Sequence, residues 1–289
     1  MVETENQFTI KKTLNCGGRL IDLTGGKIMG VLNVTPDSFF DGGQYITEDA
    51  QWRKTEQMLN EGATFIDIGG YSTRPGATDM SVDEEMARVI PAIEKIRRKF
   101  PEAILSIDTF RAKVAEEAVT AGAHIINDIS GGQMDETMWE TAARLQVPYI
   151  LMHIQGNPQN MQENPHYEDI TKEILYFFSK AIENLTKLGL NDVIIDPGFG
   201  FGKNLLHNFQ LLKKMQLFPE ILGGRPLMAG VSRKSMINKL LGTKPENALN
   251  GTTVVNTLAL LHNADILRVH DVKEAAQTLK IVNYYREAI

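Results

Sequence analysis

The sequence predicts an α/β protein, a (β/α)8 TIM barrel, and three observations favour that fold. Short apolar runs rich in β-branched residues recur along the 289 residues, and each is followed by a turn and a helical pattern. The runs are continuously apolar, which is typical of parallel strands that are buried on both faces. Eight strands that alternate with helices over about 250 residues match the size of such a barrel.

Each of the eight predicted strands is a short run between turn residues or helix ends. An open, doubly wound sheet is the alternative, but it usually shows a Gly-x-Gly-x-x-Gly loop after its first strand. Here Gly30 precedes Val-Leu-Asn without that pattern, which favours the barrel. Residues Gln7–Gly26, before the first strand, are expected to form a small hairpin that closes the barrel floor. The strands are expected at Lys27–Leu32, Thr64–Ile68, Ile104–Ile107, His124–Asn127, Tyr149–Met152, Val193–Ile195, Leu227–Val231 and Asp265–Val269.

The helices between the strands are marked by their ends. Ser81-Val82-Asp83-Glu84 is a capping box that opens a helix, and Pro91 within the same apolar pattern is expected to kink it. Ala112–Thr120 and Glu168–Leu188 predict two further helices. A glycine ends the helix at three similar helix-to-strand junctions, because glycine readily adopts the left-handed backbone conformation of a helix end. These glycines are Gly62, Gly122 and Gly189.

Composition narrows the class of protein. Apolar residues make up 43% of the chain and charged residues 23%, which is ordinary for one globular domain, expected to span residues 1–289. The single cysteine, Cys16, fits a reducing compartment, and no signal peptide or bilayer-spanning run is visible. We therefore expect a cytoplasmic protein without a membrane partner. The net charge of −6 argues against nucleic acid as a partner but leaves a small anionic substrate open.

A polar residue lies at the end of every predicted strand or directly after it. In a barrel the carboxyl ends of all strands converge on one face, where loops build the active site. Asp, Asn and Ser are also common helix N-caps, but that alternative explains the lysine, arginine and histidine among these residues poorly. In chain order the strand-end residues are Asn33, Asp67, Asp108, Asn127, His153, Asp196, Ser232 with Lys234, and Arg268 with His270.

Such a cavity suits a flat, polar heterocycle with an anionic tail. A carboxylate can accept two parallel N–H groups, and a pterin presents such an edge. Arg268 and its neighbours indicate a phosphate-like subsite, because a guanidinium binds phosphate oxygens with two hydrogen bonds. The loop from Asp196 to Lys203 is not a Walker A motif, since Asn204 stands where Ser or Thr is needed. Its glycines allow a tight turn near a ligand, and Phe201 offers a ring.

Eight motifs occur in one order from about residue 28 to the carboxyl end. They are Met29-Gly30-Val31-Leu32-Asn33-Val34-Thr35-Pro36-Asp37-Ser38-Phe39, Asp67-Ile68-Gly69-Gly70-Tyr71-Ser72-Thr73-Arg74-Pro75-Gly76, Ser106-Ile107-Asp108-Thr109, Ile126-Asn127-Asp128, Met152-His153-Ile154-Gln155-Gly156, Asp196-Pro197-Gly198-Phe199-Gly200-Phe201-Gly202-Lys203, Ser232-Arg233-Lys234-Ser235 and Arg268-Val269-His270-Asp271. Together they resemble the signatures of the dihydropteroate synthases. One departure is Tyr71, which stands where that family commonly has Glu; altered loop packing is expected there rather than lost activity.

The resemblance implies that a pterin ring binds deep in the barrel. Asp196 is expected to bind the 2-amino group and N3–H of the ring. Asp108 and Asn127 are expected to bind other ring nitrogens, and Lys234 would donate to the ring carbonyl and N5.

The resemblance also implies a diphosphate subsite made by Asn33, Arg74, Arg268 and His270. Asn33 is expected near a Mg²⁺ ion, a hard cation that prefers oxygen ligands and keeps several waters. The catalytic set implied by the family comprises Asn33, Asp37, Arg74, Lys234, Arg268 and His270.

The second substrate, p-aminobenzoate, is expected above the ring, and loop residues Thr35, Asp37, Phe39 and Arg74 would close over it. Its carboxylate would lie near Ser235 at a helix start. Asp67 is expected in the polar shell that orders this loop. The residues implied for p-aminobenzoate are Phe39, Thr73, Pro75, Phe201, Lys234 and Ser235.

The reaction implied is a dissociative substitution, in which 6-hydroxymethyl-7,8-dihydropterin diphosphate loses diphosphate before the amine of p-aminobenzoate attacks. A homodimer is also implied. The alternatives are a pterin-dependent methyltransferase, which has no diphosphate to bind, and an inactive pterin-binding protein. Four other polar residues are expected to have lesser roles: His153 bonds backbone, Lys203 is a loop-surface charge or a weak anion contact, and Asp128 and Asp271 act as caps.

Overall fold

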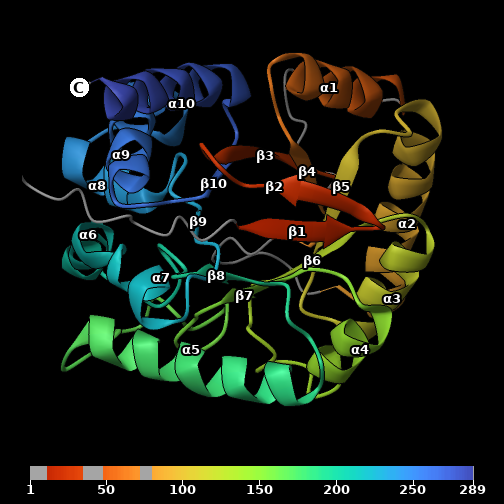
Figure 1. The fold of residues 1–289 in the computed structure, drawn as a ribbon, viewed down its shortest axis with the longest axis horizontal. Helices are drawn as coiled ribbons and strands as arrows, with labels where there is room; N and C mark the ends of the chain where they lie inside the picture. The colour runs from red at the N-terminus through yellow and green to blue at the C-terminus, as the bar shows by residue number, and fades with distance from the viewer. Residues whose placement is uncertain (1–11, 35–47, 72–79, 289) are drawn as a thin grey trace, which may run out of the picture.

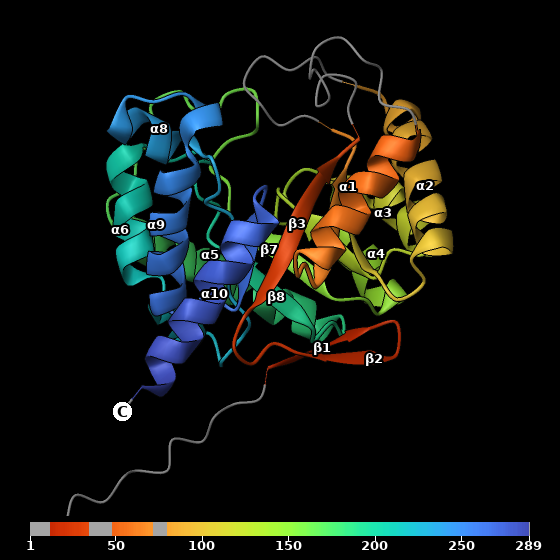
Figure 2. The same ribbon diagram turned by 90° about the horizontal axis from the view of Figure 1, so that it is seen from above.

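Eight parallel strands pair in the order β8–β7–β6–β5–β4–β3–β10–β9 around a barrel (Figures 1 and 2). The computed structural model describes residues 12–34, 48–71 and 80–288. An isolated parallel bridge between Ile195 and Leu227 joins β8 to the residue before β9, and the Ile195 amide donates to the Pro226 carbonyl over 2.8 Å. These contacts close the barrel.

The strands confirm the expected positions to within a residue or two. The seventh barrel strand is the shortest, because its ladder covers only two residues of the expected Leu227–Val231. The strands are β3 (Lys27–Asn33), β4 (Phe65–Gly69), β5 (Ile104–Asp108), β6 (Ile125–Asp128), β7 (Tyr149–Met152), β8 (Val193–Asp196), β9 (Met228–Ala229) and β10 (Ile266–Val269).

Helices surround the barrel as an outer ring (Figure 1). They are α1 (Glu48–Asn60), α2 (Val82–Lys99), α3 (Ala112–Thr120), α4 (Met138–Leu145), α5 (Ile170–Lys187), α6 (Leu205–Lys214), α7 (Leu217–Ile221), α8 (Ser235–Leu241), the 3₁₀ turn η2 (Pro245–Asn247), α9 (Leu249–Leu261) and α10 (Val272–Glu287). The (β/α)8 fold predicted from the sequence is therefore confirmed.

The helix ends agree with the capping signals in the sequence. The Glu84 amide donates to Ser81 Oγ over 3.2 Å, and the Ser81 amide donates to Glu84 Oε2 over 2.8 Å, as a capping box requires. Pro91 lies inside α2 without interrupting it. The three junction glycines have φ angles of 105°, 116° and 82° at Gly62, Gly122 and Gly189, which explains why glycine stands there.

The expected N-terminal hairpin is present and covers the floor of the barrel. Strands β1 (Thr13–Cys16) and β2 (Arg19–Asp22) pair antiparallel, and they lie beneath the end where β3 begins (Figure 2). Leu14, Cys16 and Leu23 are buried against one apolar side chain from each barrel strand. Those eight side chains are Met29, Phe65, Ile104, Ile125, Ile150, Ile194, Met228 and Ile266. The floor half of the barrel is thus an apolar core.

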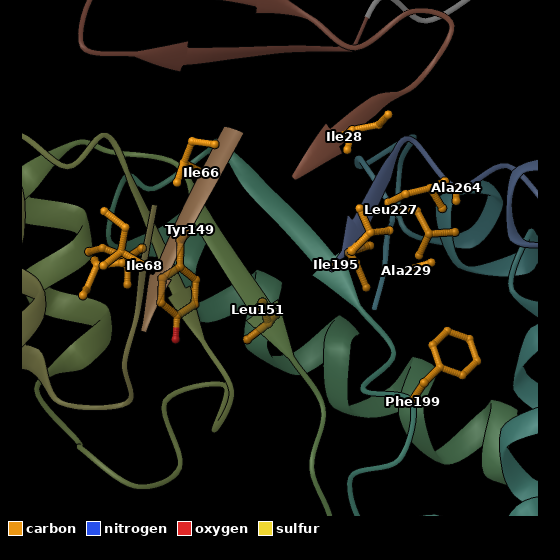
Figure 3. Packing of buried hydrophobic residues seen from close by; sticks show 14 of the residues in the cluster. Ile28, Ile66, Ile68, Tyr149, Leu151, Ile195, Phe199, Leu227, Ala229 and Ala264 are labelled. Carbon is orange, nitrogen blue, oxygen red and sulfur yellow. The ribbon is translucent and has the colours of Figure 1, made fainter. Parts of the chain in front are cut away.

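Side chains that point outward from the strands build a second apolar layer against the helices. Ile66 and Ile68 of β4 and Leu151 of β7 belong to this layer, as does Phe199 in the loop after β8 (Figure 3). Residues alternate along each strand between the helix layer and the barrel interior. The barrel interior is therefore apolar at the floor, and the polar residues of the strands lie in the interior near the carboxyl ends.

Candidate active site

The strand-end residues converge inside the barrel above the apolar floor. Asp67 and Asn127 are buried, Asp196 is 3% exposed, and Arg268 enters from β10. The loop after β9 brings Lys234 to the same place. Polar residues that are spread along the chain thus meet near the carboxyl ends of the strands, as predicted.

Arg268 bridges two carboxylates. Its Nε donates to Asp67 Oδ2 over 2.7 Å, and its Nη2 donates to Asp108 Oδ2 over 2.5 Å. Asp67 is fully buried, whereas the side chains of Asp108 and Arg268 keep 18% and 20% exposure toward the mouth. The third guanidinium nitrogen, Nη1, makes no hydrogen bond within the described part of the chain.

Asn127 joins the same network through Asp67. Its Nδ2 donates to Asp67 Oδ2 over 2.9 Å, so one carboxylate oxygen accepts from both Asn127 and Arg268. Ser106, which pairs with Asp67 across β4 and β5, is also buried. Its hydroxyl and Asp67 Oδ1 have no hydrogen-bond partner among the residues that the structure describes.

Asp196 and Lys234 form the opposite wall. Asp196 Oδ1 accepts the Gly198 amide over 2.8 Å, and Lys234 Nζ donates to the Phe199 carbonyl. The same ammonium lies 4.6 Å from the centre of the Phe201 ring. A Cβ at Gly230 would lie 3.7 Å from Lys234 Nζ and 3.8 Å from Asp196 Oδ2, so glycine keeps this space open.

Burial shifts the ionisation of these groups. Desolvation raises the pKa of Asp108 and of Asp196, against the lowering effect of Arg268 and Lys234 respectively. Burial lowers the pKa of Lys234 to about 8, although Asp196 opposes the shift. For Arg268, burial is outweighed by the carboxylates of Asp67 and Asp108, which keep its pKa above the ordinary value. Perturbed groups gathered in one cavity are typical of a functional site.

Asn33 and His270 lie at the mouth. Asn33 Oδ1 and Asp108 Oδ2 each come within 3.6 Å of a Cβ placed at Gly69, so the amide and the carboxylate are neighbours over this glycine. His270 is exposed, its Nδ1 lies 3.1 Å from Ser232 Oγ, and its amide donates to the same hydroxyl over 3.2 Å. Asn33 is the last residue of β3 and His270 directly follows β10, so both lie at the carboxyl ends of the strands.

Other predicted site residues are divided between the described and undescribed parts of the chain. Phe201 is partly buried beside Lys234, and Ser235 is exposed as the first residue of α8. The predicted loop residues lie outside the described residues, namely Thr35, Asp37, Phe39, Thr73, Arg74 and Pro75.

The expectation that Lys203 lies at the loop surface is wrong. Lys203 is 3% exposed, and its Nζ donates to the carbonyls of His153 and Phe201 over 3.2 and 2.8 Å. Its Nζ also lies 3.1 Å from His153 Nδ1. A Cβ at Gly198 would collide with the His153 carbonyl, so the two loops meet backbone to backbone. Lys203 therefore joins the loop after β8 to the loop after β7.

Sequence reasoning also missed the role of Arg233. This residue has a φ of 55°, and its guanidinium donates to both Asp271 oxygens over 2.8 and 2.6 Å. Asp271 thus pairs with Arg233 and makes no side-chain cap, contrary to expectation. The pair ties the loop that carries Lys234 to the loop after Arg268. Asp128 does cap a turn, because its carboxylate accepts from Ser130 and Gly132.

Tyr71 packs at the rim of the cavity. Its ring meets Phe110 edge-on with 5.1 Å between centroids, and the Arg111 guanidinium lies 5.4 Å from the Tyr71 ring. Tyr71 and Phe201 both flank a small apolar cluster that includes Met152. An aromatic side chain at this position therefore serves local packing.

The fold and the polar interior define a class of protein, the pterin-binding barrel enzymes: residues 29–270 match the family described as "Pterin binding enzyme". A dihydropteroate synthase of Escherichia coli K12 is 44% identical over 267 residues, covering 92% of this chain and 93% of the relative. The chain belongs to the dihydropteroate synthase family of transferases and makes dihydropteroate. This result favours the synthase over the methyltransferase alternative.

Two solved structures agree closely with the fold. A Yersinia pestis dihydropteroate synthase with a sulfonamide drug complex superposes with a TM-score of 0.90 at 44% identity, covering 96% of this chain and 100% of the other. A Xanthomonas albilineans dihydropteroate synthase in complex with 7,8-dihydropteroate gives 0.86 at 36% identity, with the same coverage. None of the helices within the described ranges is long and apolar enough to cross a membrane.

Proposed function

We propose that the polar interior binds the pterin ring through Asp108, Asn127, Asp196 and Lys234, and that Arg268 marks its diphosphate end. One observation carries this proposal: Asp196, Lys234 and Arg268 meet over Gly230, and the hydrogen bonds of Arg268 and Asp67 join Asp108 and Asn127 to them. Carboxylate and amide oxygens accept ring N–H groups, while an ammonium donates to a ring carbonyl. An apolar floor beneath them suits a flat ring.

The diphosphate is expected at the mouth, where Arg268, His270 and Asn33 lie. The Arg268 side chain keeps 20% exposure, and His270 is exposed. We propose that Arg74 completes this subsite. A guanidinium and an imidazole stabilise the negative charge that develops on a leaving diphosphate.

The second substrate is expected beside Phe201 and Lys234. The Phe201 ring, already 4.6 Å from the Lys234 ammonium, offers an apolar face to the ring of p-aminobenzoate, and the exposed Ser235 hydroxyl can donate to its carboxylate. We propose that Phe39, Thr73 and Pro75 complete the subsite.

This arrangement supports a dissociative substitution. The C–O bond to diphosphate breaks first, its electron pair leaves with diphosphate, and the resulting cation is delocalised into the dihydropterin ring. The amine of p-aminobenzoate then forms the new C–N bond and loses a proton. Arg268 and His270 stabilise the leaving group, and Lys234 fixes the ring; the proposed mechanism needs no enzyme nucleophile.

The chemistry of the donor set fits Mg²⁺. Asn33 and Asp108 present oxygen atoms to one point over Gly69, and hard oxygen donors are what Mg²⁺ prefers. The described residues hold no cluster of three or more His, Cys, Asp or Glu side chains that could bind a metal by themselves. We propose that Asn33 would hold the ion against the diphosphate, where the ion would neutralise charge on the leaving group.

Release of diphosphate tests the function and its metal requirement together. Purified protein, 6-hydroxymethyl-7,8-dihydropterin diphosphate, p-aminobenzoate and Mg²⁺ are expected to give dihydropteroate and diphosphate in equal amounts. Removing the metal with a chelator should stop the release, and added Mg²⁺ should restore it. A lack of dihydropteroate in the complete mixture would refute the synthase assignment, whereas full activity in chelator would refute only the Mg²⁺ proposal.

The rate should depend on pH as a bell-shaped curve. Ring binding uses the Asp108 carboxylate and the Lys234 ammonium, and burial raises the pKa of Asp108 and lowers that of Lys234 to about 8. Activity should therefore fall as pH drops and Asp108 gains a proton, at a pH above the ordinary carboxyl range. It should also fall as pH rises past about 8 and Lys234 loses its proton. The measurement is kcat/KM against pH.

A matched variant tests whether Lys234 causes the loss of activity at high pH. Lys234→Arg keeps its charge at all these pH values, so its weaker activity should show no alkaline decline near pH 8. An unchanged alkaline limb in Lys234→Arg would contradict the assignment to Lys234.

We also propose that the enzyme is a homodimer, formed through α8 and α9. Helix α9 carries no charged residue, yet Val254 and Leu258 are 53% and 37% exposed. Leu241 of α8 is 54% exposed and continues this face, since a Cβ at Gly251 would lie 3.0 Å from its Cδ1. An uncharged apolar face of this kind is typical of a protein–protein interface.

Placing a charge on this face tests the dimer. Leu258→Glu is expected to shift the mass measured by sedimentation from dimer to monomer, because a carboxylate buried in an apolar interface lacks a partner. Leu20→Glu on the hairpin is the matched control, since Leu20 is 73% exposed and lies at the barrel floor. A monomeric wild type, or a dimer that Leu258→Glu leaves intact, would contradict the proposed interface.

We propose that the chain, residues 1–289, acts as one barrel domain in the cytoplasm. The buried thiol of Cys16 has no disulfide and fits that reducing compartment.

A further inference from the structure

We propose that Asp67 is a positioning residue that orients both halves of the substrate site, holding Asn127 for the pterin ring and Arg268 for the diphosphate. The observation is that Asp67 Oδ2 accepts two hydrogen bonds, from Asn127 Nδ2 over 2.9 Å and from Arg268 Nε over 2.7 Å. Asp67 itself is 0% exposed, so it acts on the substrates through its two partners. The inference rests on the proposed roles of Asn127 and Arg268.

Asp67 decides which way the Asn127 amide faces. An ionised carboxylate only accepts hydrogen bonds and a guanidinium only donates them, so the NH₂ group of Asn127 must turn toward Asp67. The carbonyl oxygen of the amide then faces away from Asp67 and can accept an N–H group of the ring. Without the carboxylate the amide could turn over and present a donor where the ring also has a donor.

Asp67 and Asp108 hold Arg268 in different ways. In the strand register Asp67 pairs with Ser106 and Asp108 pairs with Gly69, so Asp67 lies two residues deeper than Asp108. Asp108 is partly exposed and is itself expected to bind the ring, which requires it to share or release Arg268. Asp67 remains bound to Nε in either case. The deep carboxylate therefore keeps the guanidinium in place when the shallow one turns to the ligand.

Stability alone does not explain this arrangement. Asp67 Oδ1 is buried and has no hydrogen-bond partner in the described ranges, and a buried ion pair is often no more stable than an apolar replacement. Two hydrogen bonds to the same oxygen, Asp67 Oδ2, are instead what is needed to position both Asn127 and Arg268.

The test separates binding of each half from turnover. Asp67→Asn keeps the shape of the side chain but weakens the acceptor and adds a donor. It should weaken binding of 6-hydroxymethyl-7,8-dihydropterin and of inorganic diphosphate with Mg²⁺ by about tenfold each, since hydrogen bonds to charged groups contribute on this scale. Asp265→Asn is the matched control: it breaks the 2.7 Å ion pair with Lys12 at the barrel floor, so it should lower Tm and leave both affinities unchanged.

A swap variant tests the orientation of the amide. In Asp67→Asn/Asn127→Asp the new amide at position 67 can donate to the new carboxylate and accept from Arg268 Nε, and total charge is kept. Ring binding should return to within about threefold of wild type, because the hydrogen bond is restored with its direction reversed. If Asp67→Asn does not fold, ring binding by the swap variant alone tests whether Asp67 orients Asn127.

Three results would overturn the proposal. Asp67→Asn that lowers only Tm, as Asp265→Asn does, would show a structural role. A folded swap variant without recovered ring binding would refute the orientation of Asn127. An unfolded swap variant would count against the proposal too, because the exchanged pair keeps its charge and hydrogen bonds. None of these results affects the synthase assignment, which diphosphate release measures separately.

Discussion

Replacing Arg268 with methionine is expected to reduce both activity and stability more than any other single change in the site. Asp67 and Asp108 would lose their shared cation, and breaking a buried pair by removing one partner costs about 3–5 kcal/mol. Loss of a group that stabilises a developing anion lowers kcat by about a hundredfold to a thousandfold. Urea unfolding and kcat/KM measure the two effects.

The stability loss in Arg268→Met should also depend on pH. Burial raises the pKa of Asp108 and Arg268 opposes that shift, so without the guanidinium the Asp108 carboxyl favours folding most at low pH and the variant loses stability as pH rises. Arg225→Met is the matched control. Arg225 donates to the Asn191 carbonyl below the barrel over 2.8 Å, so its loss should cost about 1 kcal/mol and leave kcat/KM unchanged. An Arg268→Met enzyme as active as Arg225→Met would contradict the proposed role.

Replacing Lys234 with alanine is expected to weaken ring binding and slow the reaction together. The ammonium contacts the Phe199 carbonyl, lies over Phe201 and faces Asp196, so it joins the ring site to the site proposed for p-aminobenzoate. Loss of a charged hydrogen-bond donor should cost about 3 kcal/mol, which is about a hundredfold in kcat/KM. The effect should appear in the KM for the dihydropterin diphosphate and in kcat.

Lys239→Ala provides the comparison for Lys234→Ala. Lys239 lies on α8 five residues later and is exposed, so its loss should change neither constant. A Lys234→Ala enzyme that kept its kcat and changed only the KM for p-aminobenzoate would refute the ring contact.

The fold could be predicted from local patterns because each strand is a short apolar run that can be recognised in the sequence. Asp108 and Asp196 end β5 and β8, and Asn127 is the residue before the last of β6. Barrel topology then brings them together without any knowledge of the loops. Lys234, Arg268 and His270 were recognised because lysine, arginine and histidine are poor helix N-caps. The floor hairpin followed from Gln7–Gly26 preceding the first strand.

The missed features depend on contacts between distant segments. The burial of Lys203 arises from a loop 50 residues away, whose His153 carbonyl it bonds, and a lysine after a glycine-rich loop gives no local sign of this. Arg233 was missed because its left-handed backbone and its pair with Asp271 belong to the packed structure. The shared use of Asp67 by Asn127 and Arg268 likewise requires the register of three strands.

A crystal structure with 6-hydroxymethyl-7,8-dihydropterin diphosphate tests the central claim most directly. The ring should lie above the apolar floor, with Asp196, Asn127, Asp108 and Lys234 all within hydrogen-bond distance of it and its diphosphate directed toward Arg268 and His270. A ring bound elsewhere, or one that touches none of these four side chains, would contradict the account.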